Sequence, residues 1–449
     1  MKENPRYTAV QILNTVDEKK AYAEPLLDFH QSKRVFMHEN DRRLLTQLVY
    51  GTLRLQKRLD WVIAAFYRGD FSEMETGLKN ILRTALLQIS EMDRIPPFAA
   101  VDEAVKLAKK LFPGRASLVN AVLRNAIRGM KRLTCPDFSA DPLHHISIMH
   151  SHPEWLVSFW IDELGVEETR RLCESNNEIP SLILRVNAMK MTRDEALAEC
   201  AAAGLDAAPT RFSPDGITVS RLPGPVRDMA LFRDGCIQIQ DEASQLVSRL
   251  VEPGPGERVL DLCAGTGIKT THLAEIMRNE GSITAVDVSG HKLDMLRDNA
   301  RRLGISIIRT VEGDATGAID VLDGRSFDRI LVDVPCSGLG TLRRNPEIKW
   351  HRDRQDVENM AALQKNILHK AVSYLKEKGT LVYSTCTISF PENNKVVGEF
   401  LDAHPGYHRV HPPVTLSKEV VDTGGYFRTS PHHHGTDGFF GAILKRRDM

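Results

Sequence analysis

The sequence predicts a multidomain protein with an all-helical N-terminal domain, a small α+β module and an α/β domain built on a parallel sheet. Apolar residues recur at helical spacing in the first 132 residues. Strand-like and helix-like segments mix after Pro153, and strands alternate with helices from residue 256 onward. The expected domain ranges are 1–135, 150–235 and 236–449.

The N-terminal region is helical in pattern and basic in charge. Leu44, Leu45, Leu48, Val49 and Leu53 recur at helical spacing. Residues 1–132 carry 23 Lys and Arg against 15 Asp and Glu, although the whole chain is balanced at 59 of each. A basic domain favours a polyanionic partner, although solvated basic helices are also common.

The small module and the α/β domain follow from local patterns. Leu182–Val186 and Gly216–Val219 suit strands, and Thr192–Ala203 suits a capped helix. Residues 133–150 lose helical periodicity, so we expect an irregular linker there. In the α/β domain, the expected strands are Arg258–Leu262, Ser282–Val288, Phe327–Val334 and Gly379–Ser384.

Several classes of protein are excluded by composition. The seven cysteines are odd in number and lack C-x-x-C spacing, which argues against a disulfide framework and a zinc finger. The first residues lack the apolar run of a signal peptide, and no apolar stretch reaches the ~18 residues of a membrane helix. We therefore expect a cytoplasmic enzyme.

A glycine turn follows the first strand of the α/β domain. The segment from Asp261 to Lys269 contains Gly265 and Gly267, whose backbone can approach a ligand closely at the start of a helix. The next strand ends in Asp287, 20 residues after Gly267. An acid at that place holds ribose hydroxyls in a Rossmann-like fold. The turn therefore predicts a nucleoside-containing cofactor.

The choice between a dinucleotide and S-adenosylmethionine depends on the surrounding residues. Dinucleotide sites usually have a third small residue, but position 270 is Thr. Further strands are followed by Asp314 and Asp333. A row of carboxylates suits a cationic ligand without phosphate, such as S-adenosylmethionine, although single acids at such places can simply cap helices.

Two cysteines follow neighbouring strands of the predicted sheet. Cys336 lies in Asp333-Val334-Pro335-Cys336, and Cys386 follows Ser384-Thr385. A lone cysteine is more often a small core residue, but a pair at the ligand-binding edge of a sheet favours chemistry. A thiolate that adds to carbon 6 of cytosine makes carbon 5 nucleophilic enough to accept a methyl group. The pair therefore points to methylation of cytosine carbon 5.

These segments resemble one known family. DLCAGTGIKT, DVPCSGLGTLRRNPEIKW, YSTCTISFPEN and TDGFFGAILKR are similar to the RNA 5-methylcytosine methyltransferases, and more narrowly to their RsmB (Sun, Fmu) branch, which modifies small-subunit ribosomal RNA. DRRLLTQLVYGTLRLQKRLDWVI near the N-terminus resembles the NusB fold, an RNA-binding helical domain. The resemblance implies a Rossmann-like class I methyltransferase domain and S-adenosylmethionine as cofactor.

The resemblance also implies residue roles. Cys386 would be the nucleophile, Cys336 would help release the product, and Asp333 would contact both the base and the cofactor. The implied cofactor residues are Cys263, Ala264, Gly265, Thr266, Gly267, Ile268, Lys269, Asp287, Asp314 and Asp333. The family usually has Pro at position 266 and Gly at position 268, so the contacts of this loop stay open.

Other features allow two interpretations. Basic residues could meet RNA phosphates or simply be solvated; they are Arg124, Arg128, Lys131, Arg132, Arg343 and Arg344. We expect a surface loop at His432–His434, since suitable partner ligands for a metal are missing nearby. The expected partner is ribosomal RNA, with no membrane, DNA or metal, and the chain is expected to be a monomer. The alternatives are a tRNA cytosine-5 methyltransferase and a non-catalytic RNA-binding factor.

Overall fold

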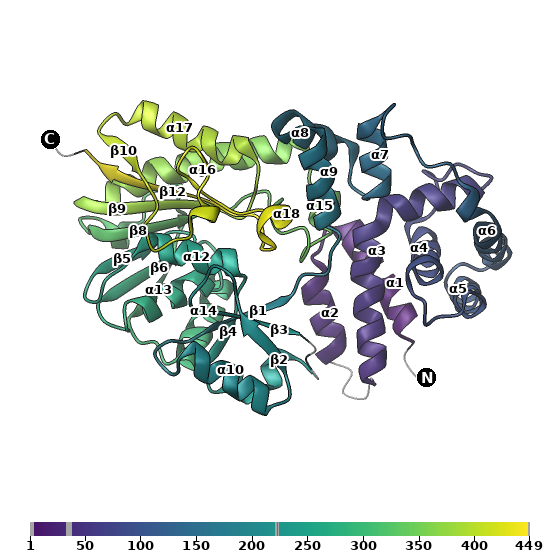
Figure 1. Cartoon of the computed structure of the whole chain (residues 1–449), viewed down its shortest axis with the longest axis horizontal. Helices are drawn as coiled ribbons and strands as arrows, with labels where there is room; N and C mark the ends of the chain where they lie inside the picture. Colours follow the sequence, from purple (N-terminus) through teal and green to yellow (C-terminus); the bar gives the residue numbers. More distant parts are fainter. Residues whose placement is uncertain (1–3, 33–37, 221, 223, 448–449) are drawn as a thin grey trace. The chain divides into compact units, whose positions relative to one another are not determined.

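The structure, a computed structural model, describes residues 4–32, 38–220, 222 and 224–447. The chain forms two compact units, each assembled from two stretches of sequence (Figure 1). The first unit holds residues 1–178 and 342–353, and the second holds residues 179–341 and 354–449. Within the described ranges, no helix is long and apolar enough to cross a membrane.

The first unit is all helical, as predicted for its N-terminal part. A buried core that includes Leu45, Leu48, Leu53, Ile81 and Leu82 holds its first helices together. The helices are α1 (Pro5–Lys19), α2 (Ala23–Ser32), α3 (Glu39–Phe66), α4 (Thr76–Glu91), α5 (Pro97–Leu111), α6 (Ala116–Gly129), η1 (Met130–Arg132), α7 (Pro142–Met149), α8 (Glu154–Leu164), α9 (Val166–Ser175) and α15 (Ile348–His351).

Helix α7 lies inside the segment that we expected to be an irregular linker. Asp141 caps it by accepting a hydrogen bond from the backbone N–H of His144, and Pro142 occupies its first turn. Ile146 and Ile148 are buried. The linker prediction is therefore wrong for residues 142–149, because a cap and a short apolar face are enough for two helical turns without extended periodicity.

Helix α3 is kinked at Leu55, whose φ of −107° and ψ of 15° are not helical. The indole Nε1 of Trp350 donates to the carbonyl of Leu53 at 2.7 Å, and Lys349 Nζ donates to the carbonyl of Arg54 at 2.9 Å. On the other side of the kink, Ser151 Oγ accepts a hydrogen bond from the N–H of Lys57 at 2.9 Å. Side chains from distant segments therefore satisfy backbone groups at the break.

Residues 342–353 thus belong to the first unit through buried polar contacts. The carboxylate of Glu347 accepts a hydrogen bond from the N–H of Ala23 at 2.8 Å, and the guanidinium of Arg54 donates to the carbonyl of Arg343 at 3.1 Å. Lys349 is fully buried, and burial lowers its pKa to about 7. This short segment, which starts six residues after Cys336, completes the helical core.

The second unit contains a four-stranded antiparallel sheet with strand order β2-β3-β1-β4. Its elements follow a β-α-β-β-α-β sequence, the arrangement of a ferredoxin-like fold. The expected capped helix is present with a full capping box between Thr192 and Glu195. The elements are β1 (Leu182–Val186), α10 (Arg193–Ala202), β2 (Asp206–Pro209), β3 (Gly216–Ser220), η2 (Val226–Asp228), α11 (Ala230–Arg233) and β4 (Ile237–Ile239). The small α+β module is therefore confirmed.

An eight-stranded sheet forms the rest of the second unit. Its main strand order is β10-β12-β9-β8-β5-β6-β7, with β11 paired to β12. The run from β9 to β7 is parallel, as predicted, but β10, β11 and β12 are antiparallel and were not anticipated. The strands are β5 (Arg258–Asp261), β6 (Ser282–Asp287), β7 (Ile308–Glu312), β8 (Phe327–Asp333), β9 (Leu375–Thr385), β10 (Tyr407–Val410), β11 (Phe427–Arg428) and β12 (Phe440–Arg446).

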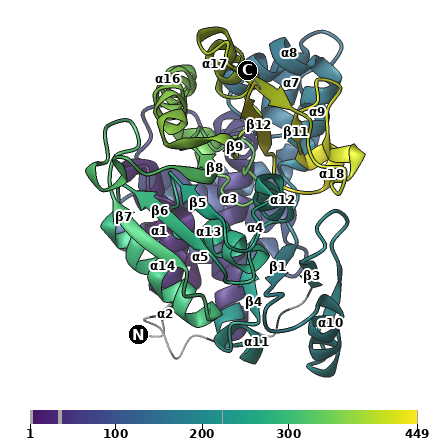
Figure 2. The same cartoon turned by 90° about the vertical axis from the view of Figure 1, so that its left-hand side faces the viewer.

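Helices cover both faces of the large sheet (Figures 1 and 2). One buried cluster joins one face to α16 and α17, and another joins the opposite face to α12, α13 and α14. The helices and short 3-10 turns of this region are α12 (Glu242–Val251), α13 (Ile268–Ile276), α14 (Gly290–Leu303), η3 (Asp320–Leu322), α16 (Arg354–Ala371), η4 (Val372–Tyr374), η5 (Phe390–Glu392), α17 (Asn394–Ala403), η6 (Lys418–Val420) and α18 (Pro431–His434). A sheet covered in this way leaves its strand ends available for ligands.

Lys349 should make the stability of the first unit depend on pH. Its pKa is about 7 in the folded chain and ~10.4 when unfolded, so the unfolded chain binds the extra proton between these values. Stability should therefore rise with pH from about 7, by at most about 1.4 kcal/mol per pH unit. Lys349→Met should remove this rise. Urea unfolding followed by tryptophan fluorescence reports this unit alone, because all four tryptophans (Trp61, Trp155, Trp160 and Trp350) lie in it.

A matched control is Lys106→Met, which removes an exposed lysine from α5. The thiol of Cys173 is buried and its pKa is raised in the folded chain, so its ionisation in the unfolded chain would add a second pH dependence to the free energy of unfolding. Measurements between pH 6.5 and 8.5 keep this contribution small. If the free energy of unfolding changed with pH in the same way for the wild type and Lys349→Met, Lys349 would not be a buried neutral amine.

Candidate active site

A tight turn connects β5 to α13. Gly265 and Gly267 have φ values of 56° and 81°, in the left-handed region. A Cβ on Gly267 would lie 2.3 Å from Cγ of the buried Leu296, whereas a Cβ on Gly265 would meet nothing within 4 Å. Both positions favour glycine for their backbone, and position 267 also needs it for space. Ile268 is the first residue of α13, so its side chain sits on an ordinary helical backbone.

This turn lines a cavity of about 200 Å³ at the carboxyl edge of the sheet. The lining residues are Asp261, Cys263, Ala264, Gly265, Thr266, Ile268, Lys269 and Asp333. The structure therefore brings together seven of the ten residues expected around a cofactor. The others, Gly267, Asp287 and Asp314, are not among the lining residues.

Asp287 and Asp314 have different surroundings. Asp287, at the end of β6, accepts hydrogen bonds from the N–H of Gly265 and of Ser289, both at 2.9 Å. It therefore holds the glycine turn. Asp314 is exposed and accepts from the N–H and the hydroxyl of Thr316, which keeps its pKa below the usual value. That carboxylate shapes a local turn after β7.

Asp261 is a cavity residue that the sequence reasoning missed. Its Oδ2 accepts a hydrogen bond from Thr270 Oγ1 at 2.7 Å, whereas its buried Oδ1 has no partner in the described ranges. Burial raises the pKa of Asp261 to about 7, with a further contribution from the nearby Asp333. The usable signal was its place at the end of β5, in the same row of acids as Asp287 and Asp333. A buried acceptor beside this cavity fits a cationic, hydrogen-bonding ligand.

Asp333, the last residue of β8, is held by side chains from α13 and β9. Its Oδ2 accepts from Lys269 Nζ at 2.6 Å and its Oδ1 from Ser384 Oγ at 2.7 Å. Burial works against the charge of Lys269, but Asp333 and, less strongly, Cys386 raise its pKa above the usual value. The ammonium of Lys269 therefore persists at neutral pH and attracts negative charge on either neighbour.

The two predicted cysteines meet at the edge of the sheet. The Sγ atoms of Cys336 and Cys386 lie 3.1 Å apart, because β8 pairs in parallel with β9 and places Asp333 opposite Ser384. The hydrogen bond with Cys386, burial and the charge of Glu392 all raise the pKa of Cys336. Cys336 therefore keeps its proton at neutral pH, and either sulfur can be the donor in the contact between the two thiols.

Buried polar residues support the turn that carries Cys336. The carboxylate of Glu392 accepts hydrogen bonds from the N–H of Ser337 at 2.8 Å and from its hydroxyl at 2.5 Å. Gln364 Nε2 donates to Glu392 at 3.0 Å and to the carbonyl of Pro335 at 2.9 Å. Sequence reasoning missed both residues, although Glu392 lies in the quoted FPEN segment. They fix the direction of the Pro-Cys turn.

The remaining expected residues are placed as follows. Arg343 is buried in the first unit and Arg344 is half-buried. Exposed basic side chains extend along α6 and η1; they are Arg124, Arg128, Lys131 and Arg132. The three histidines form part of the short helix α18 rather than a loop, and His434 contacts the carbonyl of Glu419 at 3.0 Å.

The sheet, the glycine turn, the row of acids and the paired thiols define the second unit as a methyltransferase domain. A family model described as 16S rRNA methyltransferase RsmB/F matches residues 248–445. The NusB family matches residues 3–128, and a ferredoxin-like domain of RsmF/B-like methyltransferases matches residues 152–227. Together these three matches extend over most of the chain.

Full-length relatives agree with these matches. The chain is 36% identical to the probable ribosomal RNA small subunit methyltransferase B of Bacillus subtilis, with 99% of each chain covered. It is 37% identical to ribosomal RNA small subunit methyltransferase B of Pseudomonas syringae, over 89% of this chain and 86% of that protein. The crystal structure of PH0851 matches with a TM-score of 0.84 and 27% identity, covering 99% of this chain and all of that one. The chain belongs to the RsmB/F family of 16S rRNA methyltransferases.

The two glycines of the turn should differ in their tolerance of a side chain. Gly265→Ala places alanine in the left-handed region without a clash and should cost about 1–2 kcal/mol. Gly267→Ala adds a clash with Leu296 and should cost clearly more. Urea unfolding followed by far-UV circular dichroism measures both losses. Equal destabilisation by the two variants would contradict the described packing of Leu296.

Proposed function

We propose that the protein transfers a methyl group from S-adenosylmethionine to carbon 5 of a cytosine in 16S ribosomal RNA, through a covalent adduct with Cys386. The observation that carries this proposal is the pair of thiols, 3.1 Å apart, next to a cavity that Asp333 also lines. The two thiols beside the cavity also favour catalysis over a purely RNA-binding role, because RNA binding alone needs neither thiol.

The cofactor would be held by residues of the glycine turn and the row of acids. S-adenosylmethionine supplies a methyl group on a positively charged sulfonium. Asp333 presents a carboxylate to the cavity, and Asp261 offers its unpartnered Oδ1 as a hydrogen-bond acceptor. Asp287 and Asp314 follow the neighbouring strands β6 and β7 at the same edge, and we assign them to the adenosine end. The backbone of Gly265 and Thr266 allows close approach.

Cys386 would act as the nucleophile. The thiol of Cys336 lies within hydrogen-bond distance of the sulfur of Cys386, and the nearby ammonium of Lys269 stabilises negative charge on that sulfur. The sulfur of Cys386 bonds to carbon 6 of the base, and the electrons of the 5,6 double bond make carbon 5 the methyl acceptor. The thiol proton of Cys386 passes to the ring nitrogen as the sulfur adds, and the resulting N–H donates a hydrogen bond to Asp333.

Cys336 would serve the release step. After methyl transfer, water takes the proton from carbon 5, and the electrons of that C–H bond restore the double bond and expel the sulfur of Cys386. The ring nitrogen returns its extra proton to that sulfur. Cys336 is the proton-carrying group beside this sulfur, and Glu392 and Gln364 hold its turn in place. The two thiols therefore have separate roles, attack and release.

The substrate is tested by incubating isolated 16S rRNA and, separately, tRNA with the full chain and S-adenosylmethionine, followed by bisulfite sequencing of each RNA. A single protected cytosine in 16S rRNA is the expected result. Protection in tRNA but not in 16S rRNA would overturn the substrate and keep the chemistry, and methylation without bisulfite protection would overturn the carbon 5 assignment.

Asp287→Ala should weaken the binding of S-adenosylmethionine by ~1.5–3 kcal/mol, the usual loss for hydrogen bonds to a charged group. Calorimetry with the full chain and no RNA measures this loss directly. Asp298→Ala, which removes an exposed acid on α14, is the matched control and should bind normally. Unchanged affinity in Asp287→Ala would remove this residue from the cofactor site.

The two cysteines should give opposite results when each is replaced by alanine. Cys386→Ala should be inactive and should form no covalent complex with RNA, because the attacking sulfur is gone. Cys336→Ala should accumulate a protein–RNA adduct that survives denaturing gel electrophoresis, because attack continues and release is slow. Cys200→Ala, buried in the small module, controls for the loss of a thiol elsewhere.

The reverse pattern, with an adduct in Cys386→Ala and none in Cys336→Ala, would exchange the two roles. If neither variant yields an adduct, RNA that contains 5-azacytidine should trap the wild type, and failure of that trap would exclude the covalent route.

A further inference from the structure

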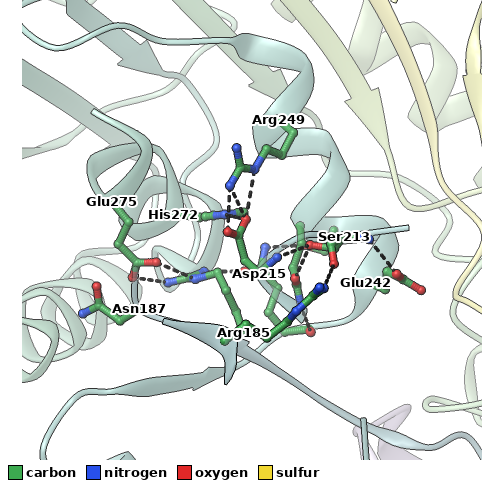
Figure 3. Close-up of polar contacts among 12 residues, drawn as sticks. Arg185, Asn187, Ser213, Asp215, Glu242, Arg249, His272 and Glu275 are labelled. Carbon is green, nitrogen blue, oxygen red and sulfur yellow. Dashed lines mark hydrogen bonds and ion pairs between the residues drawn. The ribbon is translucent and has the colours of Figure 1, made fainter. Parts of the chain in front are cut away.

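One buried arginine of the small module makes contact with the cofactor helix. Arg185 lies on β1 and is fully buried (Figure 3). Its Nη1 donates to the carbonyl of Ile268 at 2.9 Å, and its Nη2 donates to Thr271 Oγ1 at 3.2 Å. It also donates to Gln240 Oε1. The guanidinium therefore contacts the backbone of Ile268, a residue that lines the cavity.

The charge of Arg185 is balanced from the same helix. Arg185 Nε and Nη2 donate to the two oxygens of Glu275 at 3.0 and 2.7 Å. Glu275 is also buried, and burial raises its pKa while Arg185 lowers it. With these contacts, five N–H groups of the guanidinium have acceptors, which is the full set that arginine offers.

A pair of this kind contributes more to geometry than to stability. Two buried charges lose their hydration, so a buried ion pair is often no more stabilising than apolar residues of similar size. The planar guanidinium instead sets fixed directions for several acceptors at once. Arg185 holds α13 at positions 268, 271 and 275, which are spaced along one side of the helix.

A second contact from the small module holds the same helix. Asp215, next to β3, accepts hydrogen bonds from Arg249 Nε at 2.9 Å and from His272 Nε2 at 3.1 Å (Figure 3). Although burial works against it, these bonds keep the pKa of Asp215 well below its usual value. Burial lowers the pKa of His272 to about 4, so the ring is neutral at pH 7 and donates through Nε2. The start of α13 is thus fixed from the ferredoxin-like sheet.

We propose that Arg185 is a positioning residue for S-adenosylmethionine: from the small module, it sets the place of the Ile268–Lys269 backbone that lines the cofactor cavity. This rests on the proposed function, which identifies the ligand of that cavity. The small module therefore contributes to cofactor binding without lining the cavity. Through the backbone of Lys269, Arg185 also affects the hydrogen bond from Lys269 to Asp333, the residue proposed to contact the cytosine.

The test uses Arg185→Lys in the full chain. Lysine keeps the charge beside Glu275 but cannot reach all the acceptors of the planar group. We expect the Kd for S-adenosylmethionine, measured by calorimetry without RNA, to rise roughly ten-fold, the effect of about one charged hydrogen bond. The KM for S-adenosylmethionine should rise with it, whereas the KM for RNA should stay within about two-fold. A purely structural role would not separate the two KM values.

Arg329→Lys is the matched control. Arg329 also pairs with a carboxylate, Glu257 at 3.1 Å, but it lies near the start of β8, away from the ligand edge. Its Kd for S-adenosylmethionine should equal that of the wild type. If the wild type does not bind S-adenosylmethionine, the proposed function is wrong. If the wild type and folded Arg185→Lys bind it with equal affinity, only the positioning role of Arg185 is wrong.

A second variant keeps the proposal testable if Arg185→Lys does not fold. Glu275→Gln keeps the shape of the partner and removes one strong acceptor of Arg185. Glu275→Gln should raise the Kd for S-adenosylmethionine several-fold, because Arg185 is then held less firmly against the carbonyl of Ile268. An unchanged Kd in folded Glu275→Gln would count against the proposal in the same way.

Discussion

The arrangement of the proposed active site depends on the parallel pairing of β8 with β9. Their register puts Asp333 opposite Ser384, so the turns that follow the two strands begin side by side at the carboxyl edge of the sheet. Because side chains alternate between the faces of a sheet, a slip of one residue would turn the groups of one strand away from those of the other. The Sγ–Sγ distance of 3.1 Å and the hydrogen bond from Ser384 to Asp333 both follow from this register. On its far side β9 pairs with β12, with Thr385 opposite Phe440, which fixes the same strand from its second edge.

The turn from β5 to α13 differs at two positions from the pattern expected by resemblance to the family, and the structure explains why one of these differences is tolerated. Ile268 replaces a usual glycine, but it begins α13 with helical backbone, so no left-handed conformation is needed there. The contact that holds this point is made to its carbonyl oxygen, which any residue would offer. The glycine that packing requires is Gly267, where the side chain of Leu296 leaves no room. Thr266 lines the cavity, and nothing in its surroundings explains the replacement of proline.

Local patterns predicted the strand ends of the site, and long-range contacts escaped prediction. Acids and cysteines that directly follow apolar runs are visible in the sequence, which is why Asp333, Cys336 and Cys386 could be assigned to one edge of the sheet from local patterns alone. Arg185 and Glu275 are 90 residues apart in the sequence, and no local pattern indicates which carboxylate a buried arginine will pair with. The antiparallel strands β10 and β12 were missed for the same reason, since their partners are set by the finished sheet.

The kink of α3 has a consequence for how the chain is made. The carbonyls of Leu53 and Arg54 are satisfied by Trp350 and Lys349, which the ribosome adds almost 300 residues later. At 5–20 residues per second, roughly 9–35 s pass between the synthesis of residue 178 and that of residue 353. During that interval the helical core exists without its last segment, and water must occupy the open places along α3. Assembly of the first unit is therefore completed late: its last segment is made only after four of the eight strands of the large sheet, β5 to β8, have been translated.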